Sequence, residues 1–144
     1  MNRAPGQRRL GILLPQAETV GGAETMLLAV AAELAADSAV DLTLYALGQG
    51  AVVDELRQAG LPLDCLPSFR LRRPLAWWQA QKELTPLLVR DQPEMLLSWQ
   101  AKAHLVGQPA ARVAGVRASW FQHGYPDRGR IDRLARRLPT AGVF

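Results

Sequence analysis

The sequence predicts an α/β protein with a Rossmann-like, open and mostly parallel sheet that carries helices on both faces. Two observations carry this prediction. Short apolar stretches alternate along the chain with longer stretches rich in Ala, Leu and Glu, which favour helix. Strands and helices that alternate at this spacing build parallel sheets covered on both sides. Because 144 residues fit one folding unit, we expect a single domain over residues 1–144.

The first expected elements are a strand, a glycine-containing loop and a helix. Residues 9–15 (RLGILLP) are a short apolar run closed by proline, which is typical of a buried parallel strand. The loop QAETVGG follows, and then the helix-favouring stretch AETMLLAVAAELAADS. Residues 40–47 alternate as a strand does, residues 51–60 predict a helix with glycine at its C-cap, and residues 61–67 predict a third strand.

Prolines complicate the next two helices. The stretch RPLAWWQAQKELTPLLVRDQ begins with proline near a first helical turn, and Pro86 is expected to kink or end that helix. Residues 93–99 (PEMLLSW) predict a fourth strand. A helix is expected from about 101 to 116, with an interruption near Pro109.

The last part of the chain predicts a fifth strand (RASWFQHG), an amphipathic helix (RIDRLARRL) and the start of one more strand (TAGVF). In that helix, Ile131, Leu134 and Leu138 recur at helical spacing and are expected to form a core stripe. The arginines between them are expected to face water.

Composition narrows the class of protein. A hydrophobic fraction of 49% and a charged fraction of 21% are ordinary for a soluble globular domain. No apolar stretch reaches the roughly 18 to 20 residues of a transmembrane helix, and the N-terminal apolar run is too short for a secretory signal, so we expect a cytoplasmic protein. Cys65 is the single cysteine, and its apolar setting (LPLDCLP) predicts a small packing side chain.

Glycines follow the first expected strand, at the edge of the sheet where open α/β folds bind ligands. Gly21 and Gly22 can adopt backbone angles closed to other residues and let a ligand approach the main chain. The helix behind them offers free N–H groups and a positive dipole end, so a phosphate or diphosphate is the predicted ligand. Glu24 suits the first turn if its carboxylate points away from that anion. Alternatively, the glycines only let the helix pack closely on the sheet.

Two histidines differ in their expected roles. His123 stands at the carboxyl end of the fifth expected strand, where an imidazole can donate a hydrogen bond to a hydroxyl or phosphate near neutral pH. His104 lies within an expected helix and is expected to be structural. Ser119 shares a strand face with His123 by parity, but nothing supplies an orienting acid, so a catalytic triad is not indicated.

The sequence lacks the motifs of several classes of enzyme and nucleotide-binding protein. It has no G-x-G-x-x-G fingerprint, no Walker lysine and no G-x-S-x-G elbow. With two His, one Cys and no Asp-x-Asp pair, it offers no recognisable metal site. We therefore expect no bound cofactor and no metal.

The chain is basic, with a net charge of +4 and a pI near 10.0. The stretch FRLRRPLAWW contains Arg70, Arg72, Arg73 and Trp77, a mixture typical of surfaces that contact anionic lipid headgroups or an acidic acceptor. Alternatively, one tryptophan fills the core and the arginines face water. Nucleic acid is not an expected partner.

The order of these stretches resembles a known family. RLGILLP, then VGGAE before an Ala- and Leu-rich helix, then PEMLLSW, SWFQHG, an arginine-rich helix and TAGVF are similar to the N-terminal domain of GT-B glycosyltransferases of the retaining family 4 type. The similarity covers essentially the whole chain. GGAE after the first strand and QHG after the fifth are its most specific features.

The resemblance implies two facing Rossmann-like domains. A nucleoside-diphosphate sugar would be held mainly by the C-terminal domain, and a glycan or lipid-linked acceptor mainly by the N-terminal one. Gly21 and Gly22 match the loop that approaches the donor's diphosphate and sugar, and His123 matches a catalytic histidine that contacts the transferred sugar. Transfer would retain the anomeric configuration without a metal, as part of polysaccharide biosynthesis, with a peripheral location on the inner face of the membrane as a further implication.

One part of that family pattern has no counterpart here. The C-terminal domain, with its E-x7-E signature, is absent from these residues. We therefore expect that the chain is truncated before its donor-binding domain and is inactive alone. The alternative hypothesis is a non-catalytic Rossmann-like module that binds an anion or a membrane surface.

Overall fold

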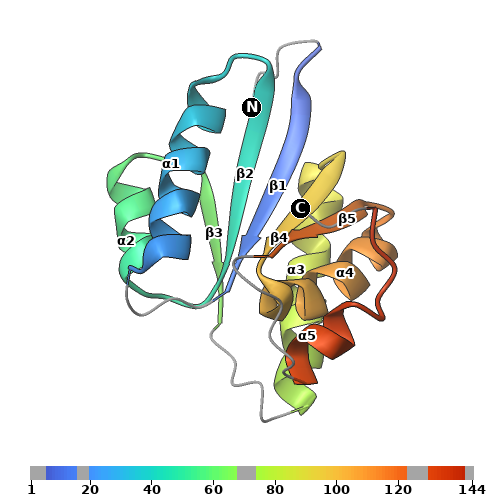
Figure 1. Cartoon of the computed structure of the whole chain (residues 1–144). Helices are drawn as coiled ribbons and strands as arrows, with labels where there is room; N and C mark the ends of the chain where they lie inside the picture. The colour runs from blue at the N-terminus through green and yellow to red at the C-terminus, as the bar shows by residue number, and fades with distance from the viewer. Residues whose placement is uncertain (1–5, 16–19, 68–73, 123–129, 142–144) are drawn as a thin grey trace.

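The fold consists of parallel strands and helices, as the sequence predicts. The computed structural model describes residues 6–15, 20–67, 74–122 and 130–141. Within them, one parallel sheet has the strand order β3-β2-β1-β4-β5 (Figure 1). Its strands are β1 (Arg8–Leu14), β2 (Val40–Leu47), β3 (Leu63–Leu66), β4 (Met95–Trp99) and β5 (Arg117–Phe121).

Helices cover both faces of this sheet (Figure 1). On one face α1 and α2 pack against β1 and β2, and on the other α3 and α4 pack against β1, β2, β4 and β5. The α/β Rossmann-like fold class is thereby confirmed. The helices are α1 (Gly22–Ala36), α2 (Ala51–Gln58), α3 (Pro74–Asp91), α4 (Ala101–Ala114) and α5 (Arg130–Ala135).

Strand β1 shows why the apolar runs are continuous. Ile12 and Leu14 pack toward α1 and α2, whereas Leu13 between them packs toward α3 and α4. A strand with helices on both faces has no water-facing side, so both parities of the sequence are apolar. Strand β1 therefore lies at the centre of the sheet, paired with β2 and β4.

Helix α4 lies unusually close to the sheet. A Cβ at Gly107 would lie 2.8 Å from Leu13 Cδ2 and 2.8 Å from Ser98 Oγ. Side-chain carbons are essentially never found at such distances, so any larger residue would force Leu13 or Ser98 to shift. The close contact fixes α4 over β1 and β4.

The prolines do not interrupt the helices. Helix α3 runs through Pro86 and α4 runs through Pro109 without a break, so the expected end or interruption at these positions is wrong. Each proline removes one backbone donor. Buried side chains on both sides of it, such as Leu84 and Leu88 around Pro86, still hold the helix on the sheet.

The last described helix also departs from expectation. Helix α5 is shorter than RIDRLARRL, and Ala135 is its fully buried side chain, with Leu138 partly buried beyond it. Ile131 and Leu134 are exposed, so the expected core stripe is wrong for both. Packing against Trp120 selects the face that carries Ala135. Of TAGVF, residues 142–144 lie outside the described residues, and Ala141 donates its N–H to Ala118 of β5.

Cys65 lies where a small packing residue was predicted. Its side chain is half-buried and packs against the cluster formed with α1 and α2. The guanidinium of Arg57 donates a hydrogen bond to its Sγ at 3.2 Å, a contact that the sequence did not indicate.

Candidate functional site at the carboxyl edge of the sheet

The strand order locates the edge where a ligand is expected. From β1 the chain proceeds outward through β2 to β3, and then α3 returns it to β4 on the other side of β1. Ligands of open α/β sheets bind beyond the carboxyl ends of the strands at such a switch point. The relevant segments follow β1 and β4, and we call this region, with the first turns of α1 and α4, the switch-point edge.

Helix α1 begins at the switch-point edge with exposed glycine backbone. Gly21 is its N-cap and Gly22 its first residue, and both are exposed. Thr25 returns two hydrogen bonds to the Gly21 carbonyl, from its N–H and from Oγ1, each at 2.9 Å. These bonds hold the first turn in place.

The reason for these glycines differs from the one expected. Gly21 has an extended backbone (φ −110°, ψ −168°) and Gly22 is helical, so neither needs angles closed to other residues. Close packing is also not the reason among the described residues, because a Cβ at Gly22 would meet none of their atoms within 4 Å, and one at Gly21 would meet the Glu24 carboxylate at 2.9 Å. The fold itself therefore does not require glycine at residue 22.

Glu24 turns back toward the helix start. Its Oε2 accepts a hydrogen bond from the Gly21 N–H at 3.1 Å, which closes a capping box. Its Oε1 accepts a long hydrogen bond, at 3.5 Å, from Gln100 Nε2. The Glu24 carboxylate thus binds a backbone N–H at the helix start, where the sequence predicted a bound phosphate. The carboxylate therefore does not point away from that position, as the prediction from the sequence required.

The segment after β4 meets α1 through two residues. Trp99 Nε1 donates to the Ala23 carbonyl at 3.1 Å, and the Trp99 ring stacks on Phe121 with centroids 4.9 Å apart. Gln100, the N-cap of α4, has φ +76°, which is uncommon for a residue with a side chain. Strain of this kind is concentrated at functional sites. Sequence reasoning singled out neither Trp99 nor Gln100 individually.

Several predicted site residues lie outside the described residues: His123, Arg70, Arg72 and Arg73. Their roles stay predictions. Strand β5 ends at Phe121, and within it Ser119 is buried with no hydrogen-bond partner for its Oγ among residues 6–15, 20–67, 74–122 and 130–141. Trp77 is described and partly buried, packed between the cluster of α3 and α4 and the cluster around Trp120.

His104 is fully buried in the first turn of α4. Its ring stacks on Trp120 with centroids 5.7 Å apart, and among the described residues neither ring nitrogen has a hydrogen-bond partner. Burial lowers the pKa of this imidazole from 6.5 to about 4. The ring is therefore neutral at pH 7 and packs as an aromatic side chain, in line with the structural role expected for it.

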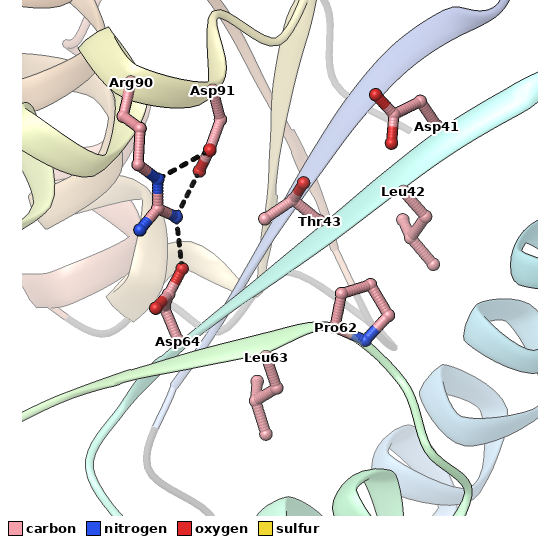
Figure 2. Close-up of a pocket in the computed structure, with 8 residues that line it drawn as sticks. All are labelled: Asp41, Leu42, Thr43, Pro62, Leu63, Asp64, Arg90 and Asp91. Atoms are coloured by element: carbon pink, nitrogen blue, oxygen red, sulfur yellow. Dashed lines mark hydrogen bonds and ion pairs between the residues drawn. The ribbon is translucent and has the colours of Figure 1, made fainter. Parts of the chain in front are cut away.

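A cavity of about 730 Å³ lies at the opposite, amino-terminal end of β2 and β3 (Figure 2). On one side of it the Arg90 guanidinium lies between Asp64 and Asp91 (Figure 2). Asp91 also accepts a hydrogen bond from the Tyr45 hydroxyl at 2.8 Å. Burial, followed by the hydrogen bond to Asp91, raises the pKa of Tyr45 well above its usual range. The Arg90 guanidinium offsets part of the negative charge of the two carboxylates, at the end of the sheet opposite the switch-point edge.

Two general properties concern the described residues alone. No three or more of their His, Cys, Asp and Glu side chains are grouped so as to hold a metal ion. Of the helices described, none combines the length and apolarity needed to cross a lipid bilayer.

Similarity to known proteins is found in structure. No protein-family model and no curated protein sequence matches the chain. The apo form of the lipopolysaccharide outer core galactosyltransferase WaaB superposes with a TM-score of 0.72 at 13% identity, over 89% of this chain and 37% of WaaB. Anabaena HepE, in complex with UDP and glucose, superposes with a TM-score of 0.68 at 18% identity, over 87% of this chain and 34% of HepE.

The chain has a GT-B glycosyltransferase-like fold. Its sheet corresponds to the N-terminal half of that fold. A further match is UDP-GlcNAc 2-epimerase from Neisseria meningitidis bound to UDP-GlcNAc, with a TM-score of 0.65 at 14% identity over 94% of this chain and 39% of the epimerase. The chain thus spans between about a third and two-fifths of these proteins. A GT-B-like fold is compatible with both activities, so the reaction has to be argued from the site.

Proposed function

We propose that the chain is the N-terminal part of a glycosyltransferase that transfers a sugar from a nucleoside-diphosphate sugar to the hydroxyl of a glycan or lipid-linked acceptor, with retention. The observation that carries this proposal is the exposed glycine backbone at the start of α1. It lies at the switch point of a GT-B-like fold, and the fold itself does not require glycine at residue 22.

The proposed roles combine the described start of α1 with the roles that the family resemblance implies. The donor's diphosphate and sugar approach Gly21 and Gly22, where the dipole of α1 stabilises negative charge that develops on the leaving diphosphate. His123 donates a hydrogen bond to the transferred sugar. Arg70, Arg72, Arg73 and Trp77 are proposed to contact the acceptor or a membrane.

The reaction needs a second half of the active site. The bond between the anomeric carbon and the diphosphate breaks, the diphosphate leaves with the electron pair, and the acceptor oxygen bonds to that carbon and loses its proton. In the proposal, a C-terminal domain binds the nucleotide and neutralises the leaving diphosphate without a metal. Residues 1–144 alone are then inactive.

Substitution of Gly22 tests the proposed donor site. A Cβ there meets nothing within 4 Å, so Gly22→Val is expected to fold normally. In the complete product of the gene, a bulky side chain at the helix start should raise the KM for the nucleotide sugar about tenfold or more. Ala32→Val, on an exposed position of the same helix, is the matched control. An unchanged KM in Gly22→Val, with UDP-glucose and other nucleotide sugars as donors, would contradict the donor site.

Substitution of His123 tests the catalytic role. His123→Ala should lower kcat more than ~10-fold while the thermal unfolding temperature is kept. Full activity in this variant would remove His123 from the mechanism.

The product distinguishes transfer from epimerisation. A retaining transferase releases nucleoside diphosphate and forms a glycosidic bond with the anomeric configuration of the donor, which NMR of the product reports. An epimerase returns the nucleotide sugar with one inverted carbon and needs no acceptor. Conversion of the nucleotide sugar without an acceptor would therefore contradict the proposed transferase activity. A glycoside product with the anomeric configuration of the donor would support it.

A further inference from the structure

Two glutamines have a positive φ, and their surroundings differ. Among the described residues other than glycine, Gln92 has φ +47° and Gln100 has φ +76°. Gln92 follows the last residue of α3, where a left-handed residue commonly ends a helix. Its N–H donates to the Leu88 carbonyl at 2.8 Å, and its Nε2 donates to the Val89 carbonyl at 3.2 Å. The fold therefore accounts for both the backbone and the side chain of Gln92.

The backbone of Gln100 has no such account. With ψ +158°, it adopts a conformation that is found almost only in glycine. Its N–H donates to the Phe121 carbonyl at 3.0 Å, and its carbonyl accepts from the His104 N–H at 3.2 Å. Both are backbone bonds, so glycine would make them equally well and without the strain. The fold alone therefore favours glycine at residue 100.

The side chain of Gln100 contributes little to the fold. Although Gln100 is the N-cap of α4, its side chain makes no capping hydrogen bond, as Ser, Asp or Asn would at that position. Among the described residues its half-buried carboxamide makes one hydrogen bond, from Nε2 to Glu24 Oε1, and at 3.5 Å this bond is weak. A strained residue whose side chain does little for stability is typical of a functional position.

We propose, on the basis of the proposed transferase function, that Gln100 is a specificity-determining residue that hydrogen-bonds a hydroxyl of the donor's sugar. A carboxamide both donates and accepts hydrogen bonds, as a hydroxyl does, whereas an ionised phosphate oxygen only accepts them. The Glu24 carboxylate beside Gln100 adds acceptor oxygens and a negative charge, which favours a neutral hydroxyl over an anion at this point. Within the proposed donor site, Gln100 thus binds the sugar, and the start of α1 binds the diphosphate.

Calorimetry on the complete product of the gene separates the sugar from the rest of the donor. The two probes are a nucleotide sugar and its nucleoside diphosphate alone. The nucleotide sugar is the one that the wild type binds most tightly among UDP-glucose, UDP-galactose, UDP-GlcNAc and GDP-mannose. Gln100→Ala should lower the affinity for it about tenfold, as the loss of a hydrogen bond to a hydroxyl does. The affinity for the nucleoside diphosphate should not change.

Gln100→Gly separates the strain from the side chain. In urea denaturation of the chain its midpoint should rise by about 0.5 M because glycine relieves the strain, whereas the midpoint of Gln100→Ala should stay near that of the wild type. Both variants should lose affinity for the nucleotide sugar to the same extent. Gln92→Gly is the matched control, because it replaces the other glutamine with a positive φ, before β4 at the amino end of the sheet. It should bind both probes as the wild type does.

Four results would overturn the proposal. An unchanged affinity of Gln100→Ala for the nucleotide sugar would remove Gln100 from the donor site and leave the proposed function intact. An equal loss of affinity for the nucleoside diphosphate would show that Gln100 acts on the nucleotide or on the shape of the site. A midpoint of Gln100→Ala lowered by about 0.5 M or more would make its side chain part of the fold. A wild type that binds none of the nucleotide sugars would contradict the proposed function, and the role of Gln100 with it.

Discussion

The two ends of the sheet differ in whether their polar side chains have hydrogen-bond or ion-pair partners. At the amino end they pair with one another: Tyr45 with Asp91, Arg90 with Asp64 and Asp91, and Arg8 of β1 with Glu94. Toward the carboxyl end, several side-chain atoms are buried with no hydrogen-bond partner in the part of the chain that the structure describes. Among the described residues these belong to Ser98, His104, Ser119, Trp120, Gln122 and Asp132.

This contrast separates stability from function. Polar atoms that are buried and unpaired are costly, and native structures usually keep them few. Where such atoms stay unpaired, the structure departs from the optimum for stability, as functional sites do. The amino end, with its paired charges and its cavity, is expected to serve the fold.

The largest effect is expected at His104. Its pKa is lowered to about 4 in the folded state against 6.5 in the unfolded one, so its neutral form stabilises the fold fully above pH 6.5 and loses that contribution as the pH falls through 4. The loss approaches about 3 kcal/mol in free energy of unfolding. Urea denaturation of the chain at pH 7, 5.5 and 4 measures it.

The control for this pH dependence replaces the imidazole. His104→Phe keeps an aromatic ring against Trp120 but cannot titrate, so its stability should fall less between pH 7 and 4 than that of the wild type. His123→Ala should keep the wild-type slope. Identical slopes in wild type and His104→Phe would show that His104 does not titrate as its burial implies.

An intermediate effect is expected at the amino end. Asp91→Ala leaves the buried Tyr45 hydroxyl without its acceptor, which should lower the free energy of unfolding by about 2 kcal/mol. Adding Tyr45→Phe removes the hydroxyl as well and should recover much of that loss in a double-mutant cycle. Neither variant should change the KM for a nucleotide sugar. A change in KM comparable to that of Gly22→Val would make the amino end part of the site.

The sequence was most informative where one physical cause dominates. Continuous apolar runs predicted the strands because both faces of a parallel sheet are buried, and β1 shows both parities packed. Proline rules failed at Pro86 and Pro109, since tertiary packing on either side outweighs one lost hydrogen bond. The face of α5 could not be read either, because small Ala135 and not the larger Leu134 fits against Trp120.

The candidate site was predicted in part, for a similar reason. Glycines before a helix mark its start, and this local signal located Gly21 and Gly22 correctly at the carboxyl edge. The contacts of Glu24 and Trp99 join α1 to β4 across 76 positions of sequence, and no local pattern contains them. Such pairs become visible only when the strand order is known.

The smallest effect on stability is expected from Glu24→Gln. This variant also tests most directly whether a diphosphate binds at the switch-point edge. The glutamine oxygen can still accept the Gly21 N–H, so the free energy of unfolding should change by only a few tenths of a kcal/mol. The negative charge beside the helix start is removed, however. If the donor's diphosphate approaches Gly21, calorimetry on the complete gene product should show about fivefold tighter binding of UDP, because a nearby like charge is gone. Glu33→Gln, near the exposed end of the same helix, should bind UDP as the wild type does. Unchanged affinity in Glu24→Gln would mean that the diphosphate lies away from Gly21. The exposed backbone of Gly21 and Gly22 would then contact the sugar of the donor instead.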